Sequence, residues 1–117
     1  SIMNQRGELV EPTAESISAA ASGVIPTDTR TSITNADAAG AYPIATFTWI
    51  IIYKEQNYSD RSKEQAIATL DLLQYILSDE AQKITSEVHY APLPAKAKEL
   101  SMKNLKTMTY DGMPILQ

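Results

Sequence analysis

The apolar segment of residues 45–53, Ala-Thr-Phe-Thr-Trp-Ile-Ile-Ile-Tyr, most constrains what this chain can fold into. β-Branched and aromatic residues dominate it, and these residue types favour strands. Because side chains alternate between the two faces of a strand, Phe47 and Trp49 fall on one face and Ile50 and Ile52 on the other. A strand that is apolar on both faces is typical of a sheet covered by helices on each side. The segment therefore predicts a buried strand of an α/β fold, with Trp49 in the core.

Three amphipathic stretches after this strand predict helices near residues 60–77, 79–88 and 95–108. Each carries apolar residues at helical spacing, so each is expected to pack one face against a core. The residues expected on the inner faces are Ala66, Ile67, Leu70, Leu73, Ile76 and Leu77 in the first helix, Ala81, Ile84 and Val88 in the second, and Leu100, Met102, Leu105 and Met108 in the third.

Short polar residues mark the expected helix starts. Ser59 or Asp60 can cap the first of these helices and Ser78 or Asp79 the second, because such side chains accept hydrogen bonds from the free N–H groups of a first turn. Asp111-Gly112 indicates a turn near the end of the chain, followed by a tail over residues 113–117.

The first forty residues predict smaller elements. Residues 1–10 indicate the end of a strand and then a turn, and residues 13–22 a short helix that begins at Pro12 or Thr13. Gly23 suits a left-handed helix C-cap. Residues 31–34 are a candidate short strand. We interpret the start of the chain within an element as a sign of a fragment of a longer protein.

Composition excludes several classes of function. The 117 residues suffice for one modest domain or for part of a larger one. A net charge of −4 argues against nucleic-acid binding. Without cysteine the chain has no disulfide, no thiolate nucleophile and no cysteine-ligated zinc. The chain contains no glycine-rich phosphate loop, no Gly-x-Ser-x-Gly elbow and no metal-binding helix motif.

The remaining polar and aromatic candidates have simpler structural interpretations. The single histidine, His89, has no catalytic or metal-ligating partner at a suitable spacing. Phe47 and Trp49 fit core packing better than a stacking platform for a sugar or base. The hydroxyl-rich residues 27–34 can bind an oxyanion, but satisfying loop backbone groups is the more common role of such side chains. We therefore predict no catalytic residue and no metal site.

Three segments carry a more specific signal. They are Asn-Gln-Arg-Gly-Glu-Leu-Val-Glu-Pro-Thr at residues 4–13, Ala-Tyr-Pro-Ile-Ala followed by the apolar segment at residues 41–53, and Tyr-Ala-Pro-Leu-Pro at residues 90–94. In this order they closely resemble the last third of the phosphate-specific solute-binding proteins, the extracytoplasmic receptors of ABC-type phosphate importers. The resemblance covers nearly the whole chain.

The resemblance implies the C-terminal portion of a two-lobed periplasmic-binding-protein (type II) fold. Residues 1–36 then resemble the end of the second lobe, residues 37–43 a hinge crossing, and residues 44–117 the part that completes the first lobe. Small residues in such a crossing absorb backbone rotation when lobes close on a ligand. The hinge candidates are Ala39, Gly40, Ala41, Tyr42 and Pro43.

The resemblance also implies that the ligand site lies outside this portion of the protein. The family holds phosphate with hydroxyls, an arginine, an aspartate and the N–H groups of helix starts, in segments upstream of this portion. Neither Arg6 nor Arg30 lies in the family's arginine context, and the family's Ser-Gly-Thr loop has no counterpart. We therefore expect no ligand-binding residue and no cofactor in this chain, and weak or no phosphate binding by the chain alone.

The implied function is transport: an extracytoplasmic receptor that delivers inorganic phosphate to the membrane permease of an ABC importer. Its expected partners are phosphate in the full-length protein, the permease, and either the missing N-terminal portion or a second copy of the chain. Two alternatives stay open. One is the scaffold portion of a phosphate-sensing or enzymatic protein with the same fold, and the other is an interaction module that binds no phosphate.

Overall fold

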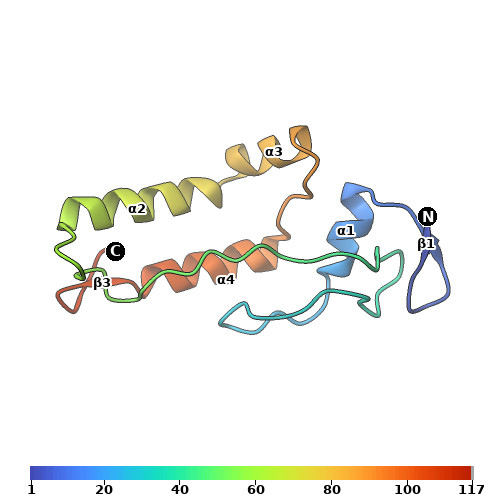
Figure 1. Ribbon diagram of the computed structural model, residues 1–117, viewed down its shortest axis with the longest axis horizontal. Helices are drawn as coiled ribbons and strands as arrows, with labels where there is room; N and C mark the ends of the chain where they lie inside the picture. The colour runs from blue at the N-terminus through green and yellow to red at the C-terminus, as the bar shows by residue number, and fades with distance from the viewer. Residues whose placement is uncertain (117) are drawn as a thin grey trace.

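The computed structural model describes residues 1–116 and shows an elongated molecule, 52 × 27 × 23 Å along its principal axes (Figure 1). Helices and two small antiparallel hairpins account for its regular structure. The elements are, in order, β1 (Ile2–Met3), β2 (Leu9–Val10), α1 (Ala14–Ala20), α2 (Lys63–Ile76), α3 (Asp79–Glu87), α4 (Ala95–Lys106), β3 (Thr109–Tyr110) and β4 (Met113–Pro114). In the hairpins Ile2 pairs with Val10, and Thr109 pairs with Pro114.

The three helices predicted after the apolar segment are confirmed as α2, α3 and α4, with ends within a few residues of those expected. The Ser78 side chain caps α3 as predicted, accepting from the Ala81 N–H. The predicted cap of α2 was wrong, because Ser62 and not Ser59 or Asp60 caps it. Ser59 and Asp60 have φ values of 50° and 58°, and their left-handed backbone forms the turn that leads into the helix.

The short N-terminal helix is also confirmed, but its end differs from the prediction. Thr13 caps α1 in a capping box with Ser16, where each side chain accepts from the other residue's N–H. The helix ends at Ala20, with Ala21 rather than Gly23 as its C-cap. Gly23 is not among the positive-φ glycines, so the expected left-handed cap is absent there.

The prediction of a strand over residues 45–53 was wrong, because this segment forms no strand in the described structure. Just after this segment, Glu55 forms an isolated parallel β-bridge with Thr109. A strand needs a neighbour for its backbone groups, and no other segment of residues 1–116 lies alongside this one as a sheet. Residues 31–34 likewise form no strand.

The missing sheet leaves expected core residues exposed. Trp49 is 43% exposed rather than buried; it contacts Phe47 edge-on and donates its indole N–H to the Thr29 carbonyl at 3.1 Å. Leu70 of α2 is fully buried, as predicted, but Leu73 is only half-buried. The inward predictions for Ile67, Ile84 and Val88 were wrong, since all three are exposed. Helices bury an apolar face only where another layer covers it.

Two separate clusters of buried residues form the core. One joins α1 to the segment after residue 32 and consists of Ala20, Ala21, Ile33, Ala41 and Ala45. The other joins Ile25 to Ala97 and Leu100 of α4. Phe47 packs against both clusters, so this half-buried ring lies where the two cores meet.

The turn predicted at Asp111-Gly112 is confirmed, with φ values of 51° and 72° that suit a tight hairpin turn. The predicted tail instead returns as β4, although its last residue, Gln117, lies outside the described residues.

Candidate functional site

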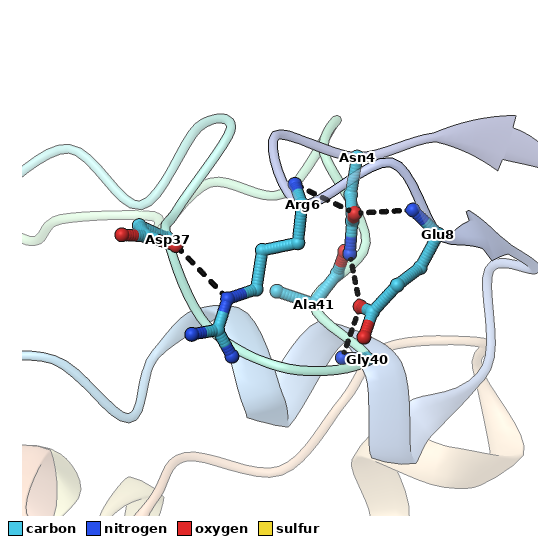
Figure 2. Close-up of polar contacts among 6 residues, drawn as sticks. All are labelled: Asn4, Arg6, Glu8, Asp37, Gly40 and Ala41. Atoms are coloured by element: carbon cyan, nitrogen blue, oxygen red, sulfur yellow. Dashed lines mark hydrogen bonds and ion pairs between the residues drawn. The ribbon is translucent and has the colours of Figure 1, made fainter.

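Of the hinge candidates, Gly40 and Ala41 lie beside the turn of the N-terminal hairpin and its polar side chains (Figure 2). Ala41 and Pro43 are buried, and Tyr42 is half-buried. Gly40 has φ = 66°, a left-handed conformation that glycine adopts without steric cost. Residues 40–43 therefore combine a tight turn at Gly40 with two buried residues, Ala41 and Pro43.

Asn4 is the centre of this polar group and is only 5% exposed. Its side-chain oxygen accepts from the N–H groups of Arg6 and Glu8, both at 3.0 Å, which closes the turn between β1 and β2. Its amide nitrogen donates to Glu8 Oε2 at 2.7 Å and to the Ala41 carbonyl at 3.2 Å. Both the oxygen and the nitrogen of the buried Asn4 amide are thus hydrogen-bonded, which offsets the cost of burying a polar group.

Glu8 links the hairpin to the crossing a second time. Its Oε2 accepts from the Gly40 N–H at 2.8 Å, across 32 residues of sequence (Figure 2). The Asn4 amide, the Gly40 N–H and the Arg6 charge together lower the pKa of the Glu8 carboxyl, because each favours the ionised form. The carboxylate is therefore charged at neutral pH and holds Gly40 in its turn.

Arg6 adds an ion pair to Asp37 at 3.1 Å between its Nε and a carboxylate oxygen. Both side chains are well exposed, so solvent screens the pair and it contributes little stability. Residues 5–7 were predicted to form a turn, but the long-range contacts of Asn4 and Glu8 were not predicted. An asparagine four residues before a glutamate is a common turn pattern, and only the fold shows what it contacts.

Further backbone bonds tie the crossing to its surroundings. The Tyr42 N–H donates to the Ser16 carbonyl at 2.9 Å, and the Asn35 N–H to the Pro43 carbonyl at 2.8 Å. The Thr34 hydroxyl donates to the Ala45 carbonyl at 3.1 Å. Residues 35–45 are thus held against α1 and the N-terminal hairpin.

The hydroxyl-rich residues 27–34 border an open groove of about 800 Å³, which residues 49–52 line on the other side. The positive charge of Arg30 is paired with Asp28 at 2.8 Å, within the same loop. A free anion needs several converging, unpaired donors. The Arg30 charge is therefore not free to bind an anion, while Lys54, Thr29, Thr31 and Ser32 line the same groove.

Over residues 1–116 no group of three histidine, cysteine or acidic side chains is placed to hold a metal ion. His89 lies exposed in the loop after α3. Within the same residues, no helix combines the length and the hydrophobicity that crossing a bilayer requires.

Comparison with known proteins finds relatives of one kind. The chain is 36% identical over 96 residues to a phosphate-binding protein PstS of Xylella fastidiosa, an alignment that covers 80% of this chain and 25% of the relative. It is 30% identical over 108 residues to the PstS of Methanocaldococcus jannaschii, covering 85% of this chain and 28% of that protein. The chain thus spans about a quarter of the length of these relatives. No family model matches, and no solved structure gives a significant match.

Proposed function

We propose that this chain is the C-terminal portion of an extracytoplasmic receptor that binds inorganic phosphate and delivers it to an ABC importer. The observation that supports this most is the 36% identity to a phosphate-binding protein over four fifths of the chain. The same kind of relative recurs in a second, distant organism. These relatives are named as binding proteins.

In this proposal residues 1–36 belong to one lobe, residues 44–117 to the other, and residues 37–43 cross between them. The elongated outline in Figure 1 is consistent with portions of two bodies, whereas each buried cluster joins residues from both sides of the crossing. In this proposal the ligand-contacting residues lie in the rest of the receptor, because the charges of Arg6 and Arg30 are paired with Asp37 and Asp28.

The rest of the receptor is also the proposed partner of the apolar segment 45–53. Ile50, Ile51 and Tyr53 are at least 60% exposed, and no strand pairs with the segment. Exposed apolar side chains beside unpaired backbone are unfavourable in water and form a template for strand addition. Strands from the remaining three quarters of the receptor would cover both.

Titration calorimetry tests the proposed function. We expect the 117-residue chain to bind phosphate weakly or not at all, and a longer protein that contains it to bind phosphate in preference to sulfate. A partial set of donors cannot replace the hydration of phosphate, and one portion cannot close around the ion. Tight binding by the chain alone would place the site in the groove beside residues 29–32. Failure of the longer protein to prefer phosphate would refute the function.

Sedimentation tests the proposed partner. We expect the isolated chain to self-associate, or to form a complex with the missing portion when both are present. Ile51→Lys should weaken either association, because it places a charge in the exposed apolar segment. Val24→Lys is the matched control, since Val24 is equally exposed, at 92%, and lies outside the segment. A compact monomer that binds no missing portion contradicts the proposal.

A further inference from the structure

The Asp111-Gly112 peptide, at the turn of the β3–β4 hairpin, joins two residues that can react with each other. We propose that this peptide is a modification site, where Asp111 converts to isoaspartate when the hairpin opens, and that Glu55 and Asn57 keep the site closed in the folded chain. Among the aspartates and asparagines of the chain, only Asp111 precedes a glycine. Glycine has no Cβ to hinder attack by its own backbone nitrogen, so the sequence selects one position for this chemistry.

The reaction takes place between neighbouring groups of one chain. The Gly112 nitrogen attacks Cγ of the protonated Asp111 carboxyl; a C–N bond forms, and the carboxyl hydroxyl leaves with the amide proton as water. Water then opens the resulting five-membered succinimide ring at either of its carbonyls. Opening at Cγ restores aspartate, whereas opening at the main-chain carbonyl gives isoaspartate, in which the chain runs through the side chain. The water lost in the first step returns in the second, so no oxidant or reductant is involved.

The folded chain restrains both reacting groups. The Gly112 N–H donates to Glu55 Oε2 and the Asp111 N–H to Glu55 Oε1, both at 3.0 Å. The Asp111 carboxylate accepts from the side-chain amide of Asn57. The nucleophile and the electrophile are thus bound to different partners, within a tight turn where both residues have positive φ. Ring closure requires rotation about the bonds between them, and this rotation breaks these hydrogen bonds.

The hairpin that carries the turn is short enough to open locally. β3 and β4 have two residues each, and Thr109 pairs with Pro114, which has no N–H to donate. Short ladders open at a small cost in free energy compared with global unfolding. Asp111 and Gly112 are exposed, so water reaches them for ring opening. The hydrogen bonds of the turn to the entry of α2 therefore decide how often the site can react.

Modification should alter the end of the chain. Isoaspartate adds one atom to the backbone of the turn, and the lengthened turn no longer matches the twist of the flanking strands. We expect loss of the pairing between Tyr110 and Met113, and of the 3.1 Å hydrogen bond from the Ile115 N–H to the Met108 carbonyl.

Peptide mapping tests the proposal. The 117-residue chain is incubated in mildly acidic buffer, because the protonated carboxyl is the reactive form, and is then digested with trypsin. Cleavage after Lys106 releases residues 107–117, in which Asp111 is the only aspartate. Electron-transfer fragmentation distinguishes isoaspartate from aspartate in this peptide, and a synthetic peptide of the same sequence gives the rate without the fold. We expect isoaspartate to form about tenfold more slowly in the folded chain, or slower still, because the reaction requires local opening.

Two variants and a control identify the restraining contacts. Glu55→Ala should speed formation in the folded chain by about threefold or more, because it frees the Gly112 N–H. Asn57→Ala should also speed it by freeing the Asp111 carboxyl; since Asn57 is exposed, this variant decides the question if Glu55→Ala does not fold. Glu87→Ala, at the exposed end of α3, should leave the rate unchanged. Equal rates in the folded chain and the free peptide overturn the proposal, as do equal rates in Asn57→Ala and Glu87→Ala or a free peptide that forms no isoaspartate.

Discussion

The Glu55 carboxylate accepts a 2.8 Å hydrogen bond from the Thr109 hydroxyl, 54 residues further along the chain. The same carboxylate accepts from the N–H groups of Asn57, Asp111 and Gly112 at 2.9–3.0 Å. One side chain thus joins the entry to α2 with the turn of the β3–β4 hairpin. This contact explains why the end of the chain folds back instead of remaining a tail.

These hydrogen bonds, first from the Asn57 N–H and then from Thr109 and Gly112, lower the pKa of Glu55 from 4.5 to about 2. A lowered folded-state pKa contributes stability that is fully present above the unfolded-state pKa. That contribution is lost as the pH falls from about 4.5 through about 2. We expect Glu55→Gln to flatten the pH dependence of unfolding in this window, measured by urea titration at several pH values. Glu87→Gln should preserve the slope, and a slope equally preserved in Glu55→Gln would contradict the role of this carboxylate.

Replacing Gly40 and Gly23 by alanine should change the free energy of unfolding differently. Gly40→Ala should lower the free energy of unfolding by about 1 kcal/mol, because φ = 66° strains a residue with a Cβ even though the added atom meets nothing within 4 Å. Gly23→Ala has the same open surroundings without the positive φ. It should be neutral or stabilise by up to about 1 kcal/mol through the unfolded state. Thermal unfolding of both variants measures the difference, and equal effects would be inconsistent with the backbone geometry.

The start of α2 gives a matched pair of serines. Ser62→Ala should destabilise the chain by about 1 kcal/mol, because the Ser62 side chain accepts from the Gln65 N–H and the Gln65 side chain accepts from the Ser62 N–H. Ser59→Ala, three residues earlier and without a capping bond, should change stability by less than about 0.5 kcal/mol. Chemical denaturation compares them. A larger effect at Ser59 would mean that Ser59, and not Ser62, caps α2.

The burial of Leu70 predicts a large cost for its removal. Leu70→Ala should lower the free energy of unfolding by about 2–5 kcal/mol, since the side chain is fully buried and leaves a cavity. Leu72→Ala, on the same helix at 58% exposure, should cost much less. Urea unfolding followed by circular dichroism at 222 nm would compare the two variants. Similar losses would mean that α2 packs through a different face.

Sequence reasoning located the helices because their signals are local. Helical spacing placed α2, α3 and α4 to within a few residues, and Ser78 was recognisable as a cap from its own neighbourhood, whereas the cap of α2 was missed. The turn at Asp111-Gly112 was predictable for the same reason, since those residue types tolerate positive φ. The hinge role of residues 39–43 stays a prediction, and their partners Asn4 and Glu8 carried no sequence signal of long-range contact.

The sequence by itself determined the positions of the helices, the Ser78 cap of α3, the turn at Asp111-Gly112 and the similarity of the chain to part of the phosphate-binding proteins PstS. The helices, the cap and the turn depend on residues close together along the chain. Only the tertiary structure decided that residues 45–53 lack a sheet, that Trp49 is exposed, and that Glu8 and Glu55 bind backbone 32 or more residues away. The physical reason is that burial and strand pairing need partners from distant segments. A strand-forming sequence becomes a strand only where another segment supplies the other half of its hydrogen bonds.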